Sequence, residues 1–358
     1  MTTDMLAQIA RAVLYEGYLL WPYRRSAIKN QQRWTFGGVY PSAYARVSGG
    51  ADRSVICADV LFEPNADDAT IEVSLRFLQV VSRQAVTIGE GGKRTPVPEL
   101  IVGSMRHLSW DEATERTTTV SCAALPGESA RVDVQLPADE QEELRRDADG
   151  RVVGAIVRSW RAIDATMTVD IASTSAADRA PLRVTVTVTN DAVWRGDAGA
   201  RDDAVRNTLV SAHIALRSEH GSFVSTEDAP AELRDVTASL RSAGLWPTLV
   251  GLPGERHTLL ASPIILGDYP RIAPESPGDL FDGGEIDQLL ILNILTLSDE
   301  EQAEMRDTDP RAREILDRCR QLGPEALMRL HATVRADRFD EPAPFPLDTE
   351  IAHERHLG

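Results

Sequence analysis

Apolar and polar positions alternate with a period of two over the middle of the chain, from Ser54 to Leu216. The clearest case is Leu182–Thr189, where aliphatic residues alternate with arginine and threonine, as in a strand with one buried and one hydrated face. Because few helical segments intervene, the pattern favours an antiparallel sandwich or barrel. The predicted strands are Ser54–Phe62, Thr70–Val81, Gln84–Ile88, Glu99–Val102, Arg116–Cys122, Ala130–Leu136, Val152–Ser159, Ala165–Ala172, Leu182–Thr189 and Thr208–Leu216.

Helical periodicity marks both ends of the chain. Residues Asp4–Leu14 place their apolar side chains on one helical face, which predicts a short amphipathic N-terminal helix. Near the other end, Ser298 and Glu301 have the spacing of a capping box, and Pro310 occupies a first helical position. The other predicted segments are helices at Pro230–Ala243 and Ile286–Leu297, a helical turn at Asp139–Arg146 and a return to the sheet within Leu245–Leu266.

These patterns predict an α+β fold, in which an antiparallel β-rich body carries a short N-terminal helix and a C-terminal helical segment. The N-terminal helix and an aromatic and arginine-rich segment occupy residues 1–45, and the β-rich body occupies residues 46–281. The C-terminal helices occupy residues 282–336. Residues 337–358 contain several prolines and scattered charges, which predicts an extended or disordered tail.

The charge balance excludes some classes of partner. The chain of 358 residues has 38 Lys and Arg against 55 Asp and Glu, a net charge of −17. Such a field repels phosphates, so we expect no nucleic acid and no membrane among the partners. Cys57, Cys122 and Cys319 are far apart and lack metal-binding spacing, and no export signal is evident. Both observations predict a cytoplasmic protein with reduced thiols.

The stretch Tyr15–Tyr44 has the most unusual composition, because tyrosines and tryptophans are interspersed there with arginines. Such residues stack single-stranded bases, but they are also enriched at protein interfaces, and the acidic chain favours a protein partner. Packing into the β-rich body competes equally with partner binding. The candidate partner-binding residues are Tyr18, Trp21, Tyr23, Arg24, Arg25, Arg33 and Trp34.

An acidic loop at 268–287 joins an apolar segment to an apolar helix. Its carboxylates, with Asp268, Glu275 and Asp282 as the candidates, are the ligands that a hard cation prefers. Their spacing does not match a calcium-binding helix–loop–helix. Asp282 and Glu285 also have the spacing of a capping pair, and a helix N-terminus stabilises nearby acids, so capping is the favoured interpretation.

No motif specifies a reaction. The histidines lack paired metal-ligand spacing, no nucleophile elbow is present, and the glycine pairs do not form a phosphate-binding loop. We therefore predict no catalytic residue and no cofactor. His213 lies in an apolar strand pattern and is interpreted as a hydrogen-bonded core residue, while Cys57 and Cys319 are interpreted as buried thiols.

Three stretches carry a resemblance to a known family. They are LYEGYLLWPYRRSAIKNQQRWTFGGVYP at Leu14–Pro41, LSWDEATER at Leu108–Arg116, and LLASPIILGDYPRIAPESPGDLFDGGEIDQLL with the following SDEEQAEMRDTDPRAREILDRC. The chain resembles an uncharacterised bacterial family encoded in gene clusters of actinobacterial-type, high-affinity NiFe hydrogenases. This resemblance implies genomic association, and it supplies no catalytic motif.

The leading hypothesis is a non-catalytic cytoplasmic accessory protein with an assembly, scaffold or partner-binding role. The resemblance implies a hydrogenase subunit, or another product of the same gene cluster, as the partner. One alternative is a small-ligand or metal-dependent enzyme whose site lies between the β-rich body and the acidic loop 268–287. The other is a self-assembling structural protein, so that a homo-oligomer stays open.

Overall fold

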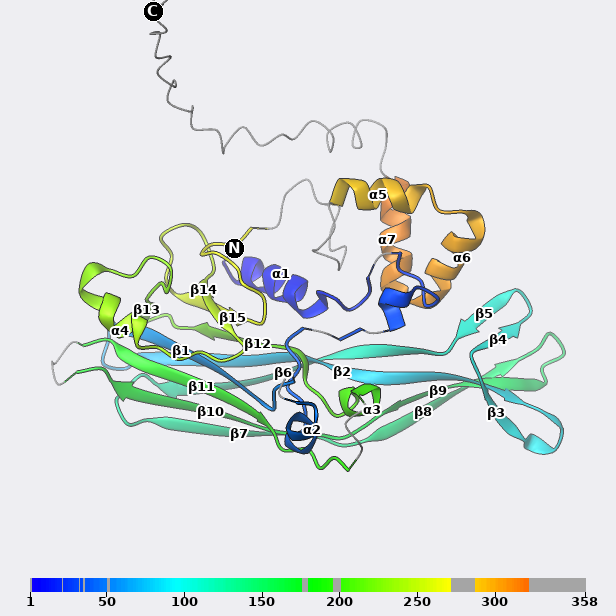
Figure 1. Cartoon of the computed structure of the whole chain (residues 1–358), viewed down its shortest axis with the longest axis horizontal. Helices are drawn as coiled ribbons and strands as arrows, with labels where there is room; N and C mark the ends of the chain where they lie inside the picture. Colours follow the sequence, from blue (N-terminus) through cyan, green and yellow to red (C-terminus); the bar gives the residue numbers. More distant parts are fainter. Residues whose placement is uncertain are drawn as a thin grey trace, which may run out of the picture.

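The described part of the chain forms two large antiparallel sheets, a two-stranded hairpin, and a layer of helices that lies over one side of the sheets (Figure 1). The computed structural model describes residues 2–20, 22–31, 33–34, 36–49, 52–175, 180–195, 201–271 and 287–321. The predicted α+β class is confirmed, with a sandwich-like β body, a short N-terminal helix and C-terminal helices. The predicted tail at 337–358 lies outside the described residues, and the boundaries at 45, 281 and 336 stay predictions.

The strands pair in two large sheets and one hairpin. The smaller sheet has the order β13 (Gly221–Phe223), β1 (Val55–Pro64), β11 (Leu182–Asn190), β10 (Ile163–Ser173) and β7 (Ser129–Leu136). The larger sheet has the order β14 (Trp246–Leu249), β15 (Thr258–Ser262), β12 (Val210–Arg217), β2 (Thr70–Ile88), β9 (Val152–Trp160) and β8 (Asp139–Arg146). Strands β3 (Arg94–Val97) and β6 (Trp110–Ala123) also pair with β2, and β4 (Glu99–Val102) pairs with β5 (Met105–Leu108).

Strand β2 runs through two different surroundings. Its first part pairs with β12 on one side and with β6 on the other, whereas its last residues pair with β9 and β3. We call the two facing sheets around its first part the sandwich. The arm consists of residues 82–88 of β2 with β3, β4, β5, β8 and β9, and it extends away from the sandwich (Figure 1).

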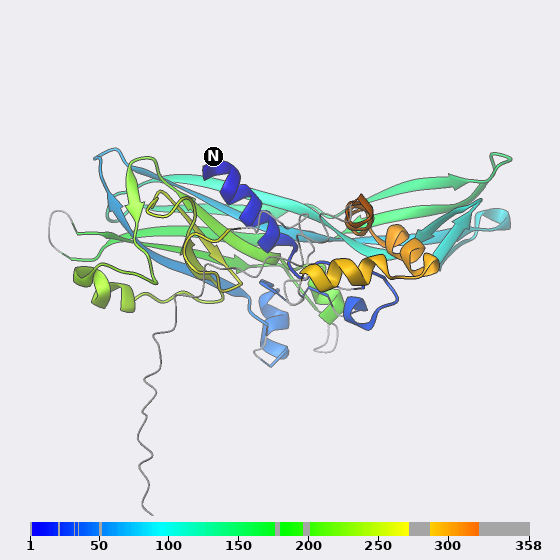
Figure 2. The same ribbon diagram turned by 90° about the horizontal axis from the view of Figure 1, so that it is seen from above.

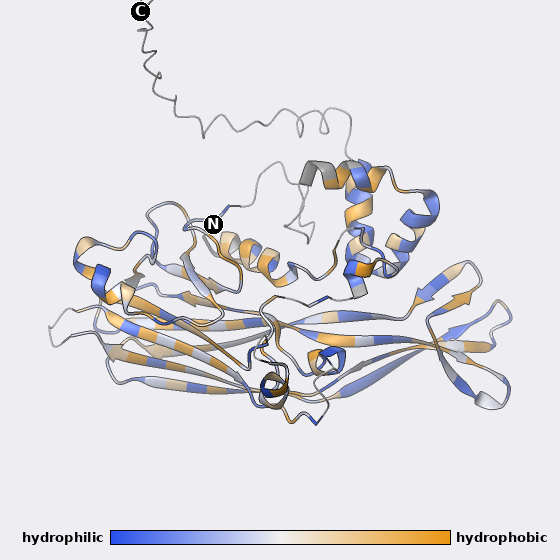
Figure 3. Ribbon diagram, viewed as in Figure 1, coloured by the Kyte–Doolittle hydropathy of each residue, from blue (hydrophilic) through white to orange (hydrophobic). Residues whose placement is uncertain are grey.

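The sandwich core comes directly from the alternation seen in the sequence. Ile71, Val73, Leu75 and Phe77 on one face of β2 are buried against apolar residues of β1, β10 and β11. Figure 3 shows the alternation of hydrophobic and hydrophilic positions along these strands. Burying this apolar surface is the main source of stability, since each large side chain contributes about 1.5–3 kcal/mol.

The helical layer covers the opposite face of the larger sheet. Helix α1 (Thr2–Tyr15) packs Leu6, Ile9 and Val13 against β12 and β15, which confirms the predicted N-terminal helix. Seen from above, α1 lies over the sandwich, whereas the C-terminal helices lie toward the arm (Figure 2). These helices are α5 (Asp287–Leu295), α6 (Asp299–Thr308) and α7 (Pro310–Gln321). The shorter helices are α2 (Ser42–Val47), α3 (Arg201–Val205), α4 (Arg234–Ala238), η1 (Ile28–Gln31), η2 (Glu90–Gly92) and η3 (Ala231–Leu233).

The predicted helix caps around α6 and α7 are present. Ser298 Oγ accepts from the Glu301 N–H, and Glu301 accepts in return from the Ser298 N–H, which is the predicted capping box. Pro310 begins α7, as predicted. Apolar α5 also packs against the rest of the chain, because Leu290, Ile291 and Ile294 are buried in a cluster with α7 and β2. The caps proposed at Asp282 and Glu285 lie outside the described residues.

Three sequence predictions are corrected. Residues Asp139–Arg146 form strand β8 rather than a helical turn, because they pair with β9 along their whole length. The separate strands predicted at Thr70–Val81 and Gln84–Ile88 are one continuous strand, β2. The helix predicted at Pro230–Ala243 is shorter, since only η3 and α4 are helical within it.

Candidate functional site

The candidate partner-binding residues do not form one exposed surface. Tyr18, Tyr23, Arg33 and Trp34 are buried, each with 7% or less of its surface exposed. These side chains pack between the helical layer and β2, and a contact with a partner through them stays a prediction. Trp21 lies outside the described residues. Interior packing, which the sequence left open, accounts for these side chains.

The remaining two arginines lie nearer the surface. Arg24 is partly exposed and forms an ion pair with Glu301, with 3.0 Å between Nη1 and Oε1. Arg25 is held to α6, because its N–H donates to Thr308 Oγ1 over 3.3 Å. A contact of Arg24 or Arg25 with a partner stays a prediction.

Three of the predicted residues meet at a pocket of about 790 Å³ between the helical layer and the sheet. We call it the arginine pocket. Its volume is within the range of small-molecule sites, about 300–1,000 Å³. Its lining residues are Arg25, Ser26, Asn30, Arg33, Trp34, Ser82, Arg83, Gln84, Arg106, Ser109, Trp110, Asp111, Asp202, Val205, Arg206 and Glu304.

The floor of the pocket is the polar interruption in β2. Ser82, Arg83 and Gln84 break the apolar alternation of that strand, and this break caused the sequence to be interpreted as two strands. The backbone continues through them, because β6 pairs with Ser82 and Arg83 while β9 pairs with all three. The polar break therefore marks a place where the strand faces a pocket, and not a place where the strand ends.

Arg33 is a buried cation at the wall of this pocket. Its guanidinium carbon lies 3.5 Å from the ring centroid of Trp110 and 4.5 Å from that of Trp34, which are cation–π distances. Nη1 donates to Tyr18 O over 3.1 Å, and Nη2 donates to Asp111 O. Burial lowers the pKa of Arg33 to about 10, which leaves the group charged at neutral pH.

The backbone near Arg33 is strained. Trp34 has φ of 67° and Tyr23 has φ of 59°, in the left-handed region that bulky residues avoid. Arg201 Nη2 donates to Trp34 O over 2.9 Å, and the Trp34 ring packs edge-on against Tyr18 with 5.3 Å between centroids. Such strain persists only where the surroundings fix it, and it is frequent at binding sites.

The pocket also holds polar nitrogen atoms with no hydrogen-bond partner. Trp110 Nε1 and Arg206 Nε are buried and lack an acceptor in the described part of the chain. The other end of the Arg206 guanidinium forms an ion pair with Asp111, with 3.7 Å between Nη2 and Oδ1. A buried donor without an acceptor costs about 1–3 kcal/mol, so each of these atoms needs an explanation.

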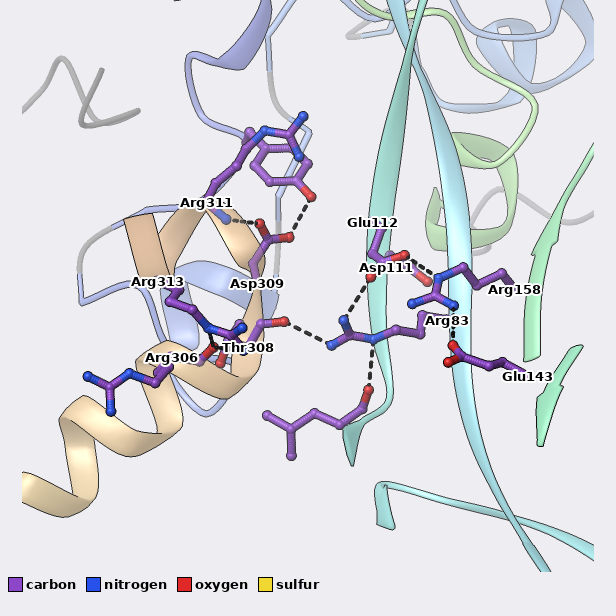
Figure 4. Close-up of polar contacts among 12 residues, drawn as sticks. Arg83, Asp111, Glu112, Glu143, Arg158, Arg306, Thr308, Asp309, Arg311 and Arg313 are labelled. Atoms are coloured by element: carbon purple, nitrogen blue, oxygen red, sulfur yellow. Dashed lines mark hydrogen bonds and ion pairs between the residues drawn. The ribbon is translucent and has the colours of Figure 1, made fainter. Parts of the chain in front are cut away.

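Arg83 fixes the helical layer over the pocket (Figure 4). Its Nη2 donates to Thr308 O over 2.8 Å, its Nε donates to Leu108 O over 3.0 Å, and its Nη1 pairs with Glu112 over 2.7 Å. Glu112 in turn pairs with Arg158 over 2.9 Å. This chain of contacts connects the C-terminal end of α6 to strands β2, β5, β6 and β9, so the pocket depends on the docking of the helices.

A second group of contacts docks the N-terminal segment on α7. Tyr18 OH donates to Asp309 Oδ2 over 2.7 Å, and the Arg311 N–H donates to Asp309 Oδ1 over 2.8 Å (Figure 4). Burial, together with the nearby Asp309 carboxylate, raises the pKa of Tyr18. The Arg311 guanidinium carbon lies 4.1 Å from the ring centroid of Tyr15. These contacts hold the wall that carries Arg25 and Arg33.

Asp268 is occupied by structural hydrogen bonds. Its Oδ1 accepts from the Leu249 N–H over 2.8 Å and from Thr248 Oγ1 over 3.2 Å, and its Oδ2 accepts from Ser225 Oγ. The other metal candidates, Glu275 and Asp282, lie outside the described residues. Within the described ranges, no group of three His, Cys, Asp or Glu side chains could hold a metal ion.

The titratable groups away from the pocket are mostly structural. His213 is fully buried, as predicted, with 2.9 Å between Nδ1 and Ser211 O, and burial lowers its pKa to about 4. Cys319 is also buried, and burial raises the pKa of its thiol to about 11. Cys57 is only half-buried, which corrects the expectation of a fully buried thiol.

The sequence missed the residues that β2, β6 and α3 contribute to the pocket. Ser82, Arg83 and Gln84 carried a signal in the broken alternation, and Ser109–Asp111 lie within the stretch LSWDEATER. Asp202 and Arg206 carried no signal, because they lie far away in the sequence and have no distinctive motif. All these positions are brought together only by the pairing of β2 and by the docking of the helical layer.

Comparisons with known proteins leave the family open. Neither a protein-family model nor a curated protein matches the chain. No helix in the described ranges is both long and apolar enough to cross a membrane. The chemistry of the arginine pocket therefore carries the functional argument. Its guanidinium, indole and hydroxyl groups are donors, which suits the binding of an acceptor-rich group.

Proposed function

We propose that the protein is a non-catalytic accessory protein of a NiFe hydrogenase system and that it holds its partner at the arginine pocket. The observation that carries this proposal is the meeting of distant segments at one pocket. Arg25, Arg33 and Trp34 come from the first stretch that resembles the hydrogenase-linked family, Trp110 comes from the second, and Glu304 comes from the third.

The residue types at the pocket support a binding role. Arginine and tryptophan are enriched among the few residues that carry most of the binding free energy at protein interfaces. The pocket gathers both types from an acidic chain, and its rim at Arg25 and Arg206 is partly exposed. The partner that we propose is a hydrogenase subunit or another product of the same gene cluster.

The cytoplasm is the compartment that we propose for this role. Cys57, Cys122 and Cys319 are free thiols. Free thiols are stable in a reducing compartment such as the cytoplasm.

Co-purification tests the proposal. A tagged copy is expressed in the native host, and the proteins that it retains are identified by mass spectrometry. We expect the hydrogenase subunit to be retained by the wild type and lost by an Arg25→Glu, Arg206→Glu double variant, because each change replaces a cation at the rim of the pocket by a carboxylate.

The matched control is Arg131→Glu, since Arg131 is exposed on β7, outside the pocket. Retention by the wild type and the control, but not by the double variant, is the expected pattern. The proposal fails if the wild type retains no product of the cluster, or if the double variant retains it equally well.

A further inference from the structure

We propose that Arg25, Arg33, Arg206 and Trp110 form a binding site for an oxyanion, a carboxylate or a phosphate group, carried by the ligand that enters the arginine pocket. This inference names the chemistry of the bound group, and it rests on the proposed function, because both use the same pocket. Its test uses the purified protein alone, so the two can fail separately.

The first support is the buried charge of Arg33. Only 5% of this residue is exposed, and among the described residues no carboxylate lies within ion-pair distance of it. Asp111 and Asp309 act on it by longer-range attraction, and its hydrogen bonds go to the backbone carbonyls of Tyr18 and Asp111 and to the side chain of Tyr18, none of which is a carboxylate. Buried charges are normally paired, so this guanidinium is a cation that lacks its counter-ion.

The second support is independent of Arg33. Trp110 Nε1 and Arg206 Nε are buried donors without acceptors in the described part of the chain, and both residues line the same pocket. An oxyanion offers several lone pairs to such donors at once, and hydrogen bonds to a charged acceptor are stronger than those to a neutral one. A neutral apolar ligand would leave both donors unpaired.

The carboxylates of the pocket do not supply the missing acceptor. Glu304 already accepts from the N–H and Oγ of Ser26, over 2.9 Å and 3.0 Å. Asp111 lies 3.7 Å from Arg206 and bonds Arg33 through its backbone oxygen rather than its side chain. Asp202 also lines the pocket, and its attraction for a cation would compete with an oxyanion. Five arginines and three acids line the pocket, and two of the arginines are paired with acids outside the lining, Arg83 with Glu112 and Arg106 with Glu99.

The other pockets lack this combination. A neighbouring cavity of about 110 Å³ also has many arginines, but Glu99, Glu112 and Glu143 pair with those on its strands. The arginine pocket alone combines, among the described residues, a buried cation with two orphan donors and room for a ligand-sized body. The bound group is therefore expected at the wall made by Arg33 and Trp110.

Titration calorimetry with inorganic phosphate and with acetate tests the site, at ionic strength held constant with chloride. We expect saturable binding of at least one probe. Constant ionic strength keeps the screening of charges the same throughout, so a saturating signal reports binding of the probe itself. If acetate binds more tightly, the group that enters the pocket is a carboxylate, such as an acidic side chain of the partner. If phosphate binds more tightly, the group is a phosphate ester.

Variants locate the binding. Arg206→Ala and Arg25→Ala are each expected to lower the affinity for the preferred probe about tenfold, since each removes a charge-assisted donor. Arg131→Ala is the matched control and should leave binding unchanged, because it lies outside the pocket. Arg33→Lys keeps the charge but loses the planar fork, so it should also weaken binding if the variant still unfolds like the wild type.

The inference is overturned if neither probe saturates the wild type in the millimolar range, or if Arg206→Ala and Arg131→Ala bind alike. Retention of the hydrogenase partner in the co-purification experiment, together with no binding of either probe, removes the oxyanion site and keeps the proposed function. Saturable binding without any retained partner has the opposite meaning. It keeps the oxyanion site and removes the proposed function.

Discussion

The sandwich and the arm share strand β2 but are stabilised in different ways. In the sandwich, one face of β2 is buried in an apolar core that includes residues of both sheets. In the arm, the buried apolar cluster contains only Ala85, Leu100, Val102 and Ile156, with Val97 and Val153 packed against it. The arm instead carries a series of ion pairs, such as Arg94–Glu142 and Arg106–Glu99.

This difference separates stability from positioning. Burial of apolar surface is strong and has no direction, so it holds the two sheets together without fixing individual polar groups. Ion pairs and hydrogen bonds add less free energy but fix direction and distance. The arginine pocket lies at Ser82–Gln84, where the apolar sandwich meets the arm with its ion pairs. Its geometry therefore depends on directional polar contacts that the sandwich supports.

The largest expected effect comes from the sandwich core. Phe77→Ala removes a fully buried ring and leaves a cavity, which should lower the free energy of unfolding by about 3–5 kcal/mol. Chemical denaturation followed by circular dichroism measures it. The matched change in the arm is Leu100→Ala. It should lower the free energy of unfolding of the whole chain less than Phe77→Ala does, because few residues pack against Leu100. Equal losses would show that the two regions unfold as one unit.

The next effect is a pH dependence of the sandwich. The pKa of His213 is about 4 in the folded chain and 6.5 when the residue is unperturbed, so the unfolded chain binds more protons between these values. Stability is therefore fully present above pH 6.5 and falls by about 3 kcal/mol as the pH drops to 4. Denaturation at several pH values, with His213→Asn for comparison, measures this slope. An unchanged slope in the variant would contradict it.

A smaller effect is expected at the junction. Glu112→Gln weakens the pairing with Arg83 and Arg158, both of which are partly buried, and should cost about 1–2 kcal/mol. Because Arg83 also holds Thr308 O, the helical layer should loosen before the sandwich does. Hydrogen exchange across residues 299–321 is the measurement. Faster exchange confined to β1 and β11 would contradict the role of Glu112 and Arg83 in docking the helical layer.

The smallest effect is expected at an exposed pair of the arm. Arg94 and Glu142 are joined by hydrogen bonds from both terminal nitrogens, and this pairing raises the pKa of Arg94. Both side chains are solvated, so solvent screens the pair. Arg94→Ala should leave the denaturation midpoint unchanged. A clear loss would show that arm ion pairs stabilise the fold as well as position it.

The strands of the sandwich could be predicted because their environment is written into the local sequence. A strand with one buried and one hydrated face must alternate, and Leu182–Thr189 does so. Strand β8 could not be predicted in this way, because both its faces are largely exposed and its residues, DEQEELRR, include strong helix formers. Its pairing with β9 overrides that local preference.

Part of the candidate site was visible in the sequence. The aromatic and arginine-rich stretch was recognised as unusual, and Arg25, Arg33 and Trp34 from it line the pocket. Whether such residues face a partner or pack inside depends on what covers them, and the cover comes from α6 and α7, more than 250 residues further along the chain. Local composition contains no information about that contact.

The sequence by itself determined the fold class, the N-terminal helix, the capping box at Ser298 and the apolar alternation, because each depends on residues that are close in the chain. Only the tertiary structure decided that β2 continues through its polar break, that Arg33 is buried between two tryptophans, and that the pocket exists. These features need contacts between distant segments. Their free energies belong to the assembled chain and not to any of its segments.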